Sequence, residues 1–583
     1  MLHTLTRSLR ENKGPALVTV LLSALEVVFE IVIPLFMSNL IDFGIEGGSM
    51  AAVWKFGAFL LLLAAFQLST GVLAARIAAR ASVGFAANLR EDMYNNVQTF
   101  AFSNIDKFST ASIVTRLTTD TTNVQNAFQM LMRMAIRAPV MLIFSMIVSF
   151  RISRDISMTF LVILPILALA LFFIIRSVFP VFSRVFRTYD ELNNVVQENV
   201  RGIRVVKSFN QERHEIGKFG AISERIYKDF SKGERLITLN APLMQFCIYT
   251  CMIVISWLGA KAIIASGNDP ALGLTTGNLT ALITYTMQIL SSLMMLSMVF
   301  AMLTISLSSA RRIAEVLEER SDIPQPEQPV MTVRDGAVDF DHVSFVYASK
   351  ADKKVLDDID LHIRSGETIG IIGGTGASKS SLVQLIPRLY DVTGGKLTLG
   401  GVDVRDYDLD TLRGAVAMVL QKNELFSGTI KENLCWGNEN ATDEELQHAC
   451  VLACADEFIS AMPDGYDTHI EQGGTNVSGG QKQRLCIARA LLKKPKVLIL
   501  DDSTSAVDTR TDAQIQQALS TYIPDTTKII IAQRISSVQN ADRIVVLDDG
   551  HIDAVGCHDE LLRTCEIYRE VYESQQKGGE DDA

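Results

Sequence analysis

Six long apolar stretches occupy the first half of the chain, and they constrain its fold more than any other feature. They lie near residues 15–41, 53–75, 134–150, 158–180, 240–265 and 279–306. About 20 apolar residues in a helix cross the hydrocarbon core of a bilayer. Lipid offers no hydrogen bonds to the backbone, so a lone spanning segment has to be helical. The sequence therefore predicts an α-helical, six-helix transmembrane domain surrounded by a lipid bilayer.

The connections between these stretches differ in length and in charge. Residues 42–50, 151–157 and 266–278 form short connections, whereas 76–133 and 181–239 are long. Most of the basic residues lie in the long connections: Arg76, Arg80, Arg90, Lys107, Arg116, Arg201, Arg204, Lys207, Arg213 and Lys218. Basic connections stay on the cytoplasmic side of a membrane. We therefore expect a multi-pass protein of the cell membrane with both termini in the cytoplasm.

The long connections have the composition of helices, so we expect the spanning helices to continue well beyond the membrane. Each connection contains a small polar cluster, at 104–112 and at 208–218. These clusters mark the turns, where a membrane domain could touch a soluble motor.

Acidic and methionine side chains inside the apolar stretches are candidates for a substrate cavity. Glu26 and Glu30 share one face of the first helix, since they are four residues apart. An acid within the membrane is commonly functional, but both could instead pair with a neighbouring helix or line water. Met287, Met294 and Met298 form a stripe on the sixth helix, which suits either adaptable substrate contacts or ordinary packing.

A phosphate-binding loop is the strongest chemical signal in the second half. A short strand pattern, Ile369–Ile372, runs into a glycine-rich loop, and a helix begins near Lys379. Backbone N–H groups of such a loop face phosphates, Lys379 reaches the β and γ oxygens, and Ser380 holds Mg²⁺. The alternative is a Gly/Ser turn. Candidate ATP ligands are Gly373, Gly374, Thr375, Gly376, Ala377, Ser378, Lys379, Ser380 and Ser381.

Two further motifs follow this loop. The apolar run Val497–Leu500 predicts a buried strand that ends in Asp501, which can approach Mg²⁺. Ser478, Gly479, Gly480 and Gln481 precede a helical run and make a second anion-binding nest. The sequence thus predicts ATP and Mg²⁺ as cofactors.

The organisation follows from these patterns. Residues 1–320 form the transmembrane domain, the proline-containing segment 321–336 is a linker, and 337–583 alternate strands and helices as one α/β nucleotide-binding domain.

The net charge of −11 gives no indication of nucleic-acid binding. The cysteines are scattered without the paired spacing of a zinc site.

With these motifs in place, nearly the whole chain resembles an ABC exporter half-transporter. The resemblance implies that Tyr347 stacks on adenine and that Gln421 senses Mg²⁺ together with Ser380 and Asp501. It also implies that Ser478–Gln481 is the family signature and that Asp508 lies in the loop joining two sites. In this family two nucleotide-binding domains sandwich two ATP molecules, each between one chain's phosphate loop and the other chain's signature.

The sequence departs from the family pattern at one face of its own site. Asp502 stands where the family usually has the glutamate general base, Gln533 where it has the switch histidine, and Ser378 where it has glycine. Because the signature is intact, the chain resembles the degenerate subunit of heterodimeric, multidrug-type exporters. We therefore expect a second half-transporter that carries the glutamate and histidine, with ATP hydrolysis mainly at the composite site this partner completes.

The substrate is expected to be a small amphipathic or lipid-like molecule, because the membrane helices carry few charges and many Met and Phe residues. Two alternatives remain open from the sequence. One is a homodimeric exporter, and the other is an ATP-gated regulator that does not pump.

Overall fold

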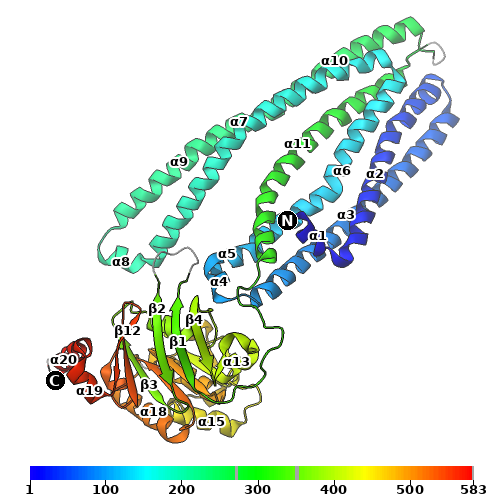
Figure 1. Cartoon of the computed structure of the whole chain (residues 1–583). Helices are drawn as coiled ribbons and strands as arrows, with labels where there is room; N and C mark the ends of the chain where they lie inside the picture. Colours follow the sequence, from blue (N-terminus) through cyan, green and yellow to red (C-terminus); the bar gives the residue numbers. More distant parts are fainter. Residues whose placement is uncertain (270–272, 348–353, 504, 581–583) are drawn as a thin grey trace. The chain divides into compact units, whose positions relative to one another are not determined.

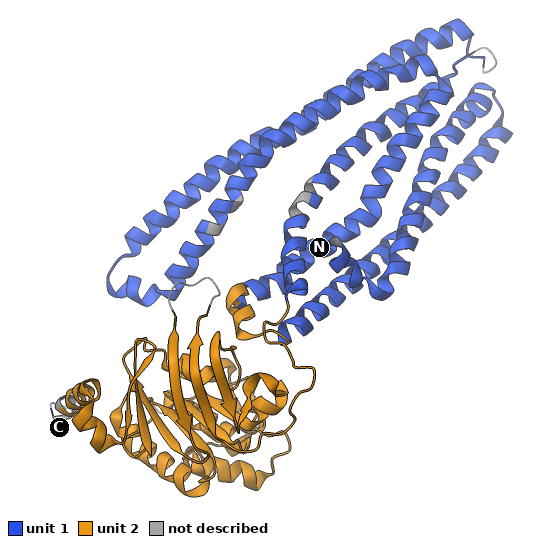
Figure 2. Cartoon of the chain, in the orientation of Figure 1, with its two compact units in different colours: residues 1–98, 110–319 blue, residues 99–109, 320–583 orange. Residues whose placement is uncertain are grey.

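The computed structural model describes residues 1–269, 273–347, 354–503 and 505–580. The chain divides into two compact units (Figure 2). Unit 1 comprises residues 1–98 and 110–319, and unit 2 comprises residues 99–109 and 320–583.

In its described residues, unit 1 consists of helices and the turns that connect them, without β-strands (Figure 1). Its elements are α1 (Leu2–Arg7), η1 (Arg10–Asn12), α2 (Lys13–Asn39), η2 (Leu40–Glu46), α3 (Met50–Gln98), α5 (Thr110–Thr115), η3 (Arg116–Asp120), α6 (Thr121–Ile152), α7 (Arg154–Arg201), α8 (Ile203–Ser208), α9 (Glu212–Thr238), α10 (Asn240–Ser266) and α11 (Thr276–Glu318). By length and composition, 6 helical segments could cross a membrane. The prediction of six transmembrane helices is confirmed.

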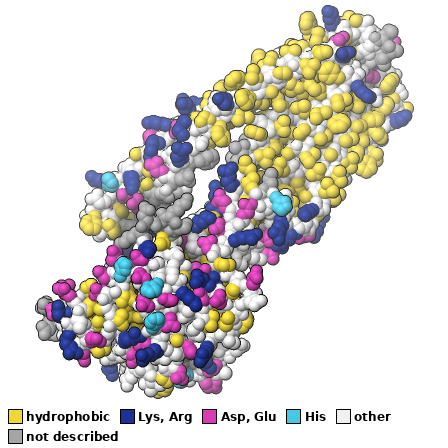
Figure 3. All heavy atoms as spheres, in the orientation of Figure 1, with side chains coloured by type: hydrophobic (Ala, Val, Ile, Leu, Met, Phe, Trp, Pro, Cys, Tyr) yellow, Lys and Arg dark blue, Asp and Glu magenta, His cyan; other side chains and the backbone are white. Residues whose placement is uncertain are grey.

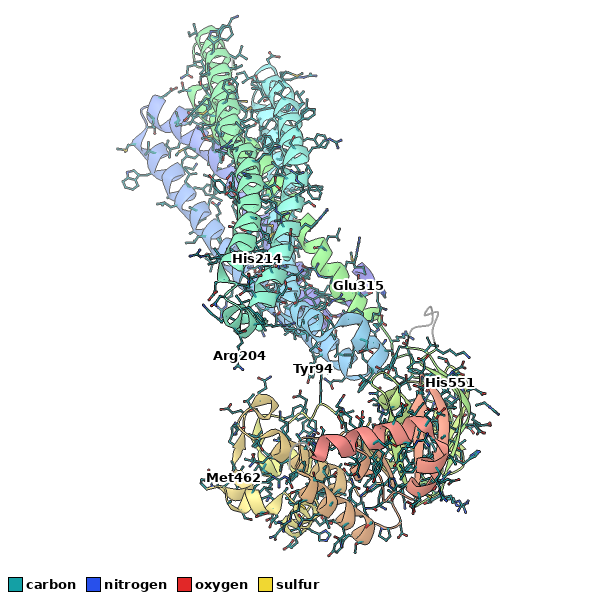
Figure 4. The ribbon with its side chains drawn as sticks, turned by 90° about the vertical axis from the view of Figure 1, so that its left-hand side faces the viewer. Tyr94, Arg204, His214, Glu315, Met462 and His551 are labelled. Atoms are coloured by element: carbon teal, nitrogen blue, oxygen red, sulfur yellow. The ribbon has the colours of Figure 1, made fainter. Side chains whose placement is uncertain are left out.

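The spanning helices extend well beyond a bilayer core, as the composition of the long connections predicts. Helix α3 has 49 residues, which is roughly 70 Å of helix against a hydrocarbon core of about 30 Å. The second long connection is a hairpin of α7 and α9 closed by α8. Figure 4 shows Arg204, on α8, at the tip of this hairpin.

Apolar side chains cover much of the surface of unit 1 (Figure 3). Trp257 on α10 is 70% exposed, and Ile253 on the same helix is 69% exposed. Such large side chains would be costly in water, and they match a lipid environment. A smaller set packs inside, where Val27, Met141 and Tyr285 join α2, α6 and α11.

Unit 2 is an α/β fold. Its elements are α4 (Phe102–Phe108), β1 (Val338–Phe345), β2 (Leu356–Ile363), β3 (Thr368–Gly373), α12 (Lys379–Gln384), β4 (Gly394–Leu399), β5 (Val402–Asp403), η4 (Val404–Asp406), α13 (Leu409–Ala415), β6 (Val416–Val419), β7 (Gly428–Thr429), α14 (Ile430–Cys435), α15 (Asp443–Leu452), α16 (Asp456–Ser460), η5 (Gly465–Asp467), β8 (His469–Ile470), η6 (Gln472–Gly474), α17 (Gly479–Leu492), β9 (Val497–Asp501), α18 (Thr509–Tyr522), β10 (Thr527–Ile531), η7 (Ile535–Ser537), β11 (Arg543–Asp548), β12 (His551–Gly556), α19 (His558–Thr564) and α20 (Glu566–Glu580).

A six-stranded sheet of order β12-β11-β3-β10-β9-β6 forms the centre of this unit. Strand β10 pairs in parallel with β3 on one side and with β9 on the other, so that Ile531 lies opposite both Ile371 and Asp501. The carboxyl ends of these three strands therefore meet at one edge, where ligands bind in open α/β sheets. A four-stranded antiparallel sheet, β2-β1-β4-β5, adds a second layer.

The polar cluster predicted at 104–112 forms a turn that belongs partly to unit 2. Helix α4 begins at Phe102, and the Phe102 ring meets the Tyr390 ring edge-on at 6.0 Å. The Tyr390 hydroxyl donates to Asp106 Oδ2 at 2.9 Å. These contacts attach α4 to the β-rich part of the unit.

Candidate nucleotide-binding site

The phosphate loop connects β3 to α12, as the sequence predicts. The Lys379 ammonium donates to the carbonyl oxygens of Gly373 and Gly374 at 2.8 Å each. This contact folds the lysine over the loop, where its charge can also meet a phosphate. An added Cβ at Gly373 would collide with the Leu547 carbonyl oxygen, so only glycine fits there.

The outer side of the loop is open. A Cβ built on Gly374 or on Gly376 would find no heavy atom within 4 Å. Open space, loop amides and one cation suit a polyphosphate. The loop therefore fits the triphosphate of a nucleotide, and Thr375 and Gly376 are exposed on it.

Ser378 occupies the position where the family has glycine, and its backbone explains why glycine is favoured. It has φ 68° and ψ 21°, in the left-handed region, directly before α12. A residue with a Cβ in this conformation costs roughly 1–2 kcal/mol more than glycine does. Ser378 therefore adds local backbone strain to the loop.

Two carboxylates lie at the end of β9 and are nearly buried. Asp501 is 3% exposed and Asp502 is 8% exposed. Burial raises the pKa of Asp501, the Ser380 hydroxyl lowers it by hydrogen bonding, and the charge of Asp502 raises it again. Burial lowers the pKa of Lys379, while both aspartates act in the opposite direction. A divalent cation at Asp501 and Ser380 would offset the crowding of negative charge, and this hard oxygen donor set fits Mg²⁺.

Asp502 accepts hydrogen bonds from two glutamines on the same oxygen. Gln533 Nε2 lies 2.7 Å from Asp502 Oδ2, and Gln421 Nε2 lies 3.3 Å from it. The structure thus brings together the base position, the switch position and the Mg²⁺-sensing position that the resemblance implies.

Tyr347 and Ser381 lie beside the phosphate loop. The Tyr347 hydroxyl and Ser381 Oγ are 2.7 Å apart. The Tyr347 ring packs edge-on against Phe345 and Tyr390, at 4.8 Å and 5.1 Å between ring centroids. With its side chain 45% exposed, this ring offers one face to a planar base. The sequence contains no local signal for the supporting contact with Tyr390.

The signature residues cap α17. Ser478 Oγ accepts from the Gln481 N–H at 3.2 Å, and Gln481 Oε1 accepts from the Ser478 N–H at 2.9 Å. This capping box fixes the start of a 14-residue helix and directs its N-terminus outward. Gly479 is exposed, and a Cβ on Gly480 would lie 2.9 Å from the Ala506 carbonyl oxygen.

The loop that contains Asp508 lies against the signature helix. Gln483, on α17, accepts from the Ala506 N–H at 3.0 Å and donates to Ser505 Oγ at 3.3 Å. Asp508 caps α18 by accepting from the Thr511 N–H at 2.9 Å. A movement of the signature would therefore reach this loop directly.

The acidic pair in the membrane helices has a basic partner that the sequence analysis missed. Arg137 on α6 reaches Glu26 Oε1 with Nη1 and Glu30 Oε2 with Nη2, both at 2.7 Å. The sequence feature that could have predicted this partner is Arg137 itself, a single arginine inside the apolar stretch 134–150. Met287, Met294 and Met298 are 45%, 39% and 62% exposed on α11, so the stripe is not interior packing within this chain.

Comparisons with known proteins agree with this architecture. The family "ABC transporter transmembrane region" matches residues 16–294, and the family "ABC transporter" matches residues 356–505. A relative from Bacillus subtilis, the uncharacterized ABC transporter ATP-binding protein YfiB, is 36% identical over 96% of both chains. The uncharacterized ABC transporter ATP-binding protein Rv1273c of Mycobacterium tuberculosis is 33% identical over 99% of this chain and 98% of its own.

Two further similarities concern exporters with a named activity or state. The ATP-dependent lipid A-core flippase of Desulfotalea psychrophila is 31% identical over 88% of this chain and 89% of its own. The solved structure of a bacterial Atm1-family ABC exporter with ATP bound has a TM-score of 0.79 at 24% identity, covering 97% of this chain and 98% of that one, which shows a shared fold. With one membrane domain followed by one nucleotide-binding domain, the chain belongs to the ABC transporters as an exporter half-transporter.

Proposed function

We propose that this chain is the degenerate-site subunit of a heterodimeric exporter. It binds ATP at its own weakened site and supplies an intact signature to the hydrolysing site of a partner half-transporter. Unit 2 and both termini face the cytoplasm, and the spanning helices lie in the cell membrane. The family assignment supports ATP as the nucleotide, and the donor set at Asp501 and Ser380 supports Mg²⁺.

The hydrogen bonding of Asp502 is the observation that carries this proposal. A general base must reach the attacking water and accept its proton. Asp502 is one methylene shorter than glutamate, and one of its two oxygens already accepts from two amides. An error of about 1 Å in such a group costs roughly 100-fold in rate. Asp502 is therefore a poor base for this reaction.

The remaining residues bind rather than react. Loop amides and Lys379 would hold the phosphates, Ser380, Gln421 and Asp501 would hold the cation, and Tyr347 would pack on the base. When bound, Mg²⁺ would neutralise charge on the β- and γ-phosphates. Gln533 can hydrogen-bond a phosphate, but it cannot carry the charge of a protonated histidine.

The signature at 478–481 would bind the nucleotide held by the phosphate loop of the partner chain. Its capping box is complete, Gly480 keeps the close approach to Ala506, and the helix N-terminus faces outward. Ser478, Gly479, Gly480 and Gln481 would then complete the partner's site, and Asp508 would lie in the loop between the two sites.

We further propose that the substrate is amphipathic or lipid-like. The exposed methionines on α11, with Glu26 and Glu30 on α2, would contribute to its path. The similarity to a protein named as a lipid A-core flippase supports a lipid-like class.

The test compares this chain alone with the chain co-expressed with a half-transporter that carries glutamate and histidine at the two altered positions. Steady-state ATPase in lipid nanodiscs should be low for the chain alone and restored in the pair. Inverted vesicles containing the pair should take up a lipid-like probe, and vanadate should stop the uptake. Robust turnover by a homogeneous preparation of this chain would establish a homodimer. ATP binding without any flux would establish a regulator.

A further inference from the structure

The C-terminal helix α20 holds the segment that contains Gln533. Gln575 on α20 accepts from the Ile535 N–H with Oε1 at 2.9 Å, and it donates from Nε2 to the Gln533 carbonyl oxygen at 2.8 Å. One side-chain amide therefore bonds two peptide groups that flank Arg534. Such a two-point contact fixes the backbone between them in one conformation.

The contact of Gln575 is connected to Asp502, the position of the general base, through a single residue, Gln533. Gln533 lies two residues beyond the end of β10, and its side chain donates to Asp502 Oδ2. A continuous path of hydrogen bonds thus runs from Gln575 through the Gln533 residue to Asp502. On the other side of the segment, Ser537 Oγ donates to Asp512 Oδ2 on α18 at 2.5 Å. Residues 533–537, which we call the switch segment, are therefore bonded to α18 at one end and to α20 at the other.

Helix α20 is itself anchored in the core, so it can serve as a fixed support. Tyr568, in its first turn, is fully buried, and its hydroxyl lies 2.7 Å from His558 Nδ1. Val571 and Tyr572 pack against the same core. Figure 1 shows α19 and α20 in red next to the sheet. The position of Gln575 is therefore set by packing two turns earlier on the helix.

We propose that Gln575 is a positioning residue for the switch segment, acting through the Gln533 and Ile535 backbone. Its amide sets where the side chain at position 533 points, and so how that side chain meets Asp502 and the γ-phosphate. The expected effect of Gln575 on ATP hydrolysis rests on the proposed function of the nucleotide site. Its hydrogen bonds to the switch segment do not depend on that proposal.

The chain offers a matched set of variants for the test. Gln575→Leu removes both bonds and keeps a side chain of similar size. Gln575→Glu can still accept from Ile535, but it cannot donate to the Gln533 carbonyl and places negative charge beside it. Gln576→Leu is the control, because Gln576 Nε2 donates only to Tyr572 on the same helix, at 2.9 Å, among the described contacts.

The first measurement is amide hydrogen exchange of the full chain in nanodiscs without nucleotide. Gln575→Leu should speed exchange at Ile535 by about five- to tenfold, as loss of one net hydrogen bond allows. Gln575→Glu should leave that amide protected, and Gln576→Leu should not change it. Equal exchange in Gln575→Leu and the wild type would overturn the proposal, whatever the function of the protein.

The second measurement separates positioning from general stability. At this chain's own site, Gln575→Leu and Gln575→Glu should each slow single-turnover ATP hydrolysis by roughly tenfold while the Kd for ATP stays within about twofold, since only geometry changes. Loss of binding in proportion to rate would show a merely structural role. An unchanged rate would show that the switch position is set without Gln575. A failure of the heterodimer proposal would appear instead as fast turnover in the wild-type chain alone.

Discussion

Gln533 Nε2 donates to Asp502 Oδ2 across 2.7 Å, which joins the two positions that the family normally fills with histidine and glutamate. The two departures therefore form one hydrogen-bonded pair. Asp502 is nearly buried and Gln533 is exposed, so the glutamine amide supplies a donor to a carboxylate that needs one.

The first prediction concerns this pair. Asp502→Glu combined with Gln533→His should raise hydrolysis at this chain's own site by at least about tenfold, the lower part of what a general base contributes. Each single change should do little, because the base and the switch act as a unit. The measurement is single-turnover hydrolysis with the partner's base disabled. If the double variant gains nothing even with Ser378→Gly added, the limit lies in the partner's signature.

The second prediction concerns the strained loop. Ser378→Gly should tighten ATP binding at this site by several-fold, because glycine adopts φ 68° without the cost that serine bears. Hydrolysis should remain slow, since Asp502 and Gln533 are unchanged. Equilibrium binding of a labelled ATP analogue provides the measurement, with Ser378→Ala as the control that keeps the Cβ. Equal affinity in all three proteins would mean that the loop tolerates serine without loss.

The third prediction assigns the two sites. In the co-purified pair, Gly480→Asp should lower steady-state ATPase far more than Lys379→Ala does. The new side chain would crowd the Ala506 carbonyl oxygen, which is 2.9 Å from the added Cβ, and bring negative charge to the partner's phosphates. Lys379 serves the slow site. Should Lys379→Ala prove the more damaging change, the roles of the two sites are reversed.

Local patterns and motif spacing anticipated the fold well. Apolar length predicted the spanning helices, and the run ending at Asp501 predicted β9 and its place beside the phosphate loop. What the sequence could not supply were contacts between residues far apart along the chain. The bond from Gln575 to the Gln533 carbonyl and the ion pairs of Arg137 depend on tertiary packing, for which neither glutamine nor arginine has a local signature. The left-handed backbone at Ser378 was visible only as a departure from a motif.

The last prediction uses Arg137, and it addresses the question that Glu26 and Glu30 leave open in the sequence. One guanidinium contacts both carboxylates, linking α2 to α6 within two of the candidate membrane spans. Arg137→Gln would leave two acids near each other without their cation. Breaking a buried ion pair costs about 3–5 kcal/mol, but the Arg137 side chain is 27% exposed, so we expect a smaller loss of about 1–3 kcal/mol.

The measurement is thermal unfolding in nanodiscs. Arg137→Gln should lower Tm clearly, and Arg133→Gln should not, because Arg133 lies one turn earlier on α6 and forms no ion pair in the part of the chain that the structure describes. Adding Glu26→Gln and Glu30→Gln to Arg137→Gln should recover most of the loss, since no unpaired charge then remains. If the triple variant regains its Tm and still transports, the three residues serve packing alone. If it regains its Tm but loses transport, the charges of this cluster take part in transport.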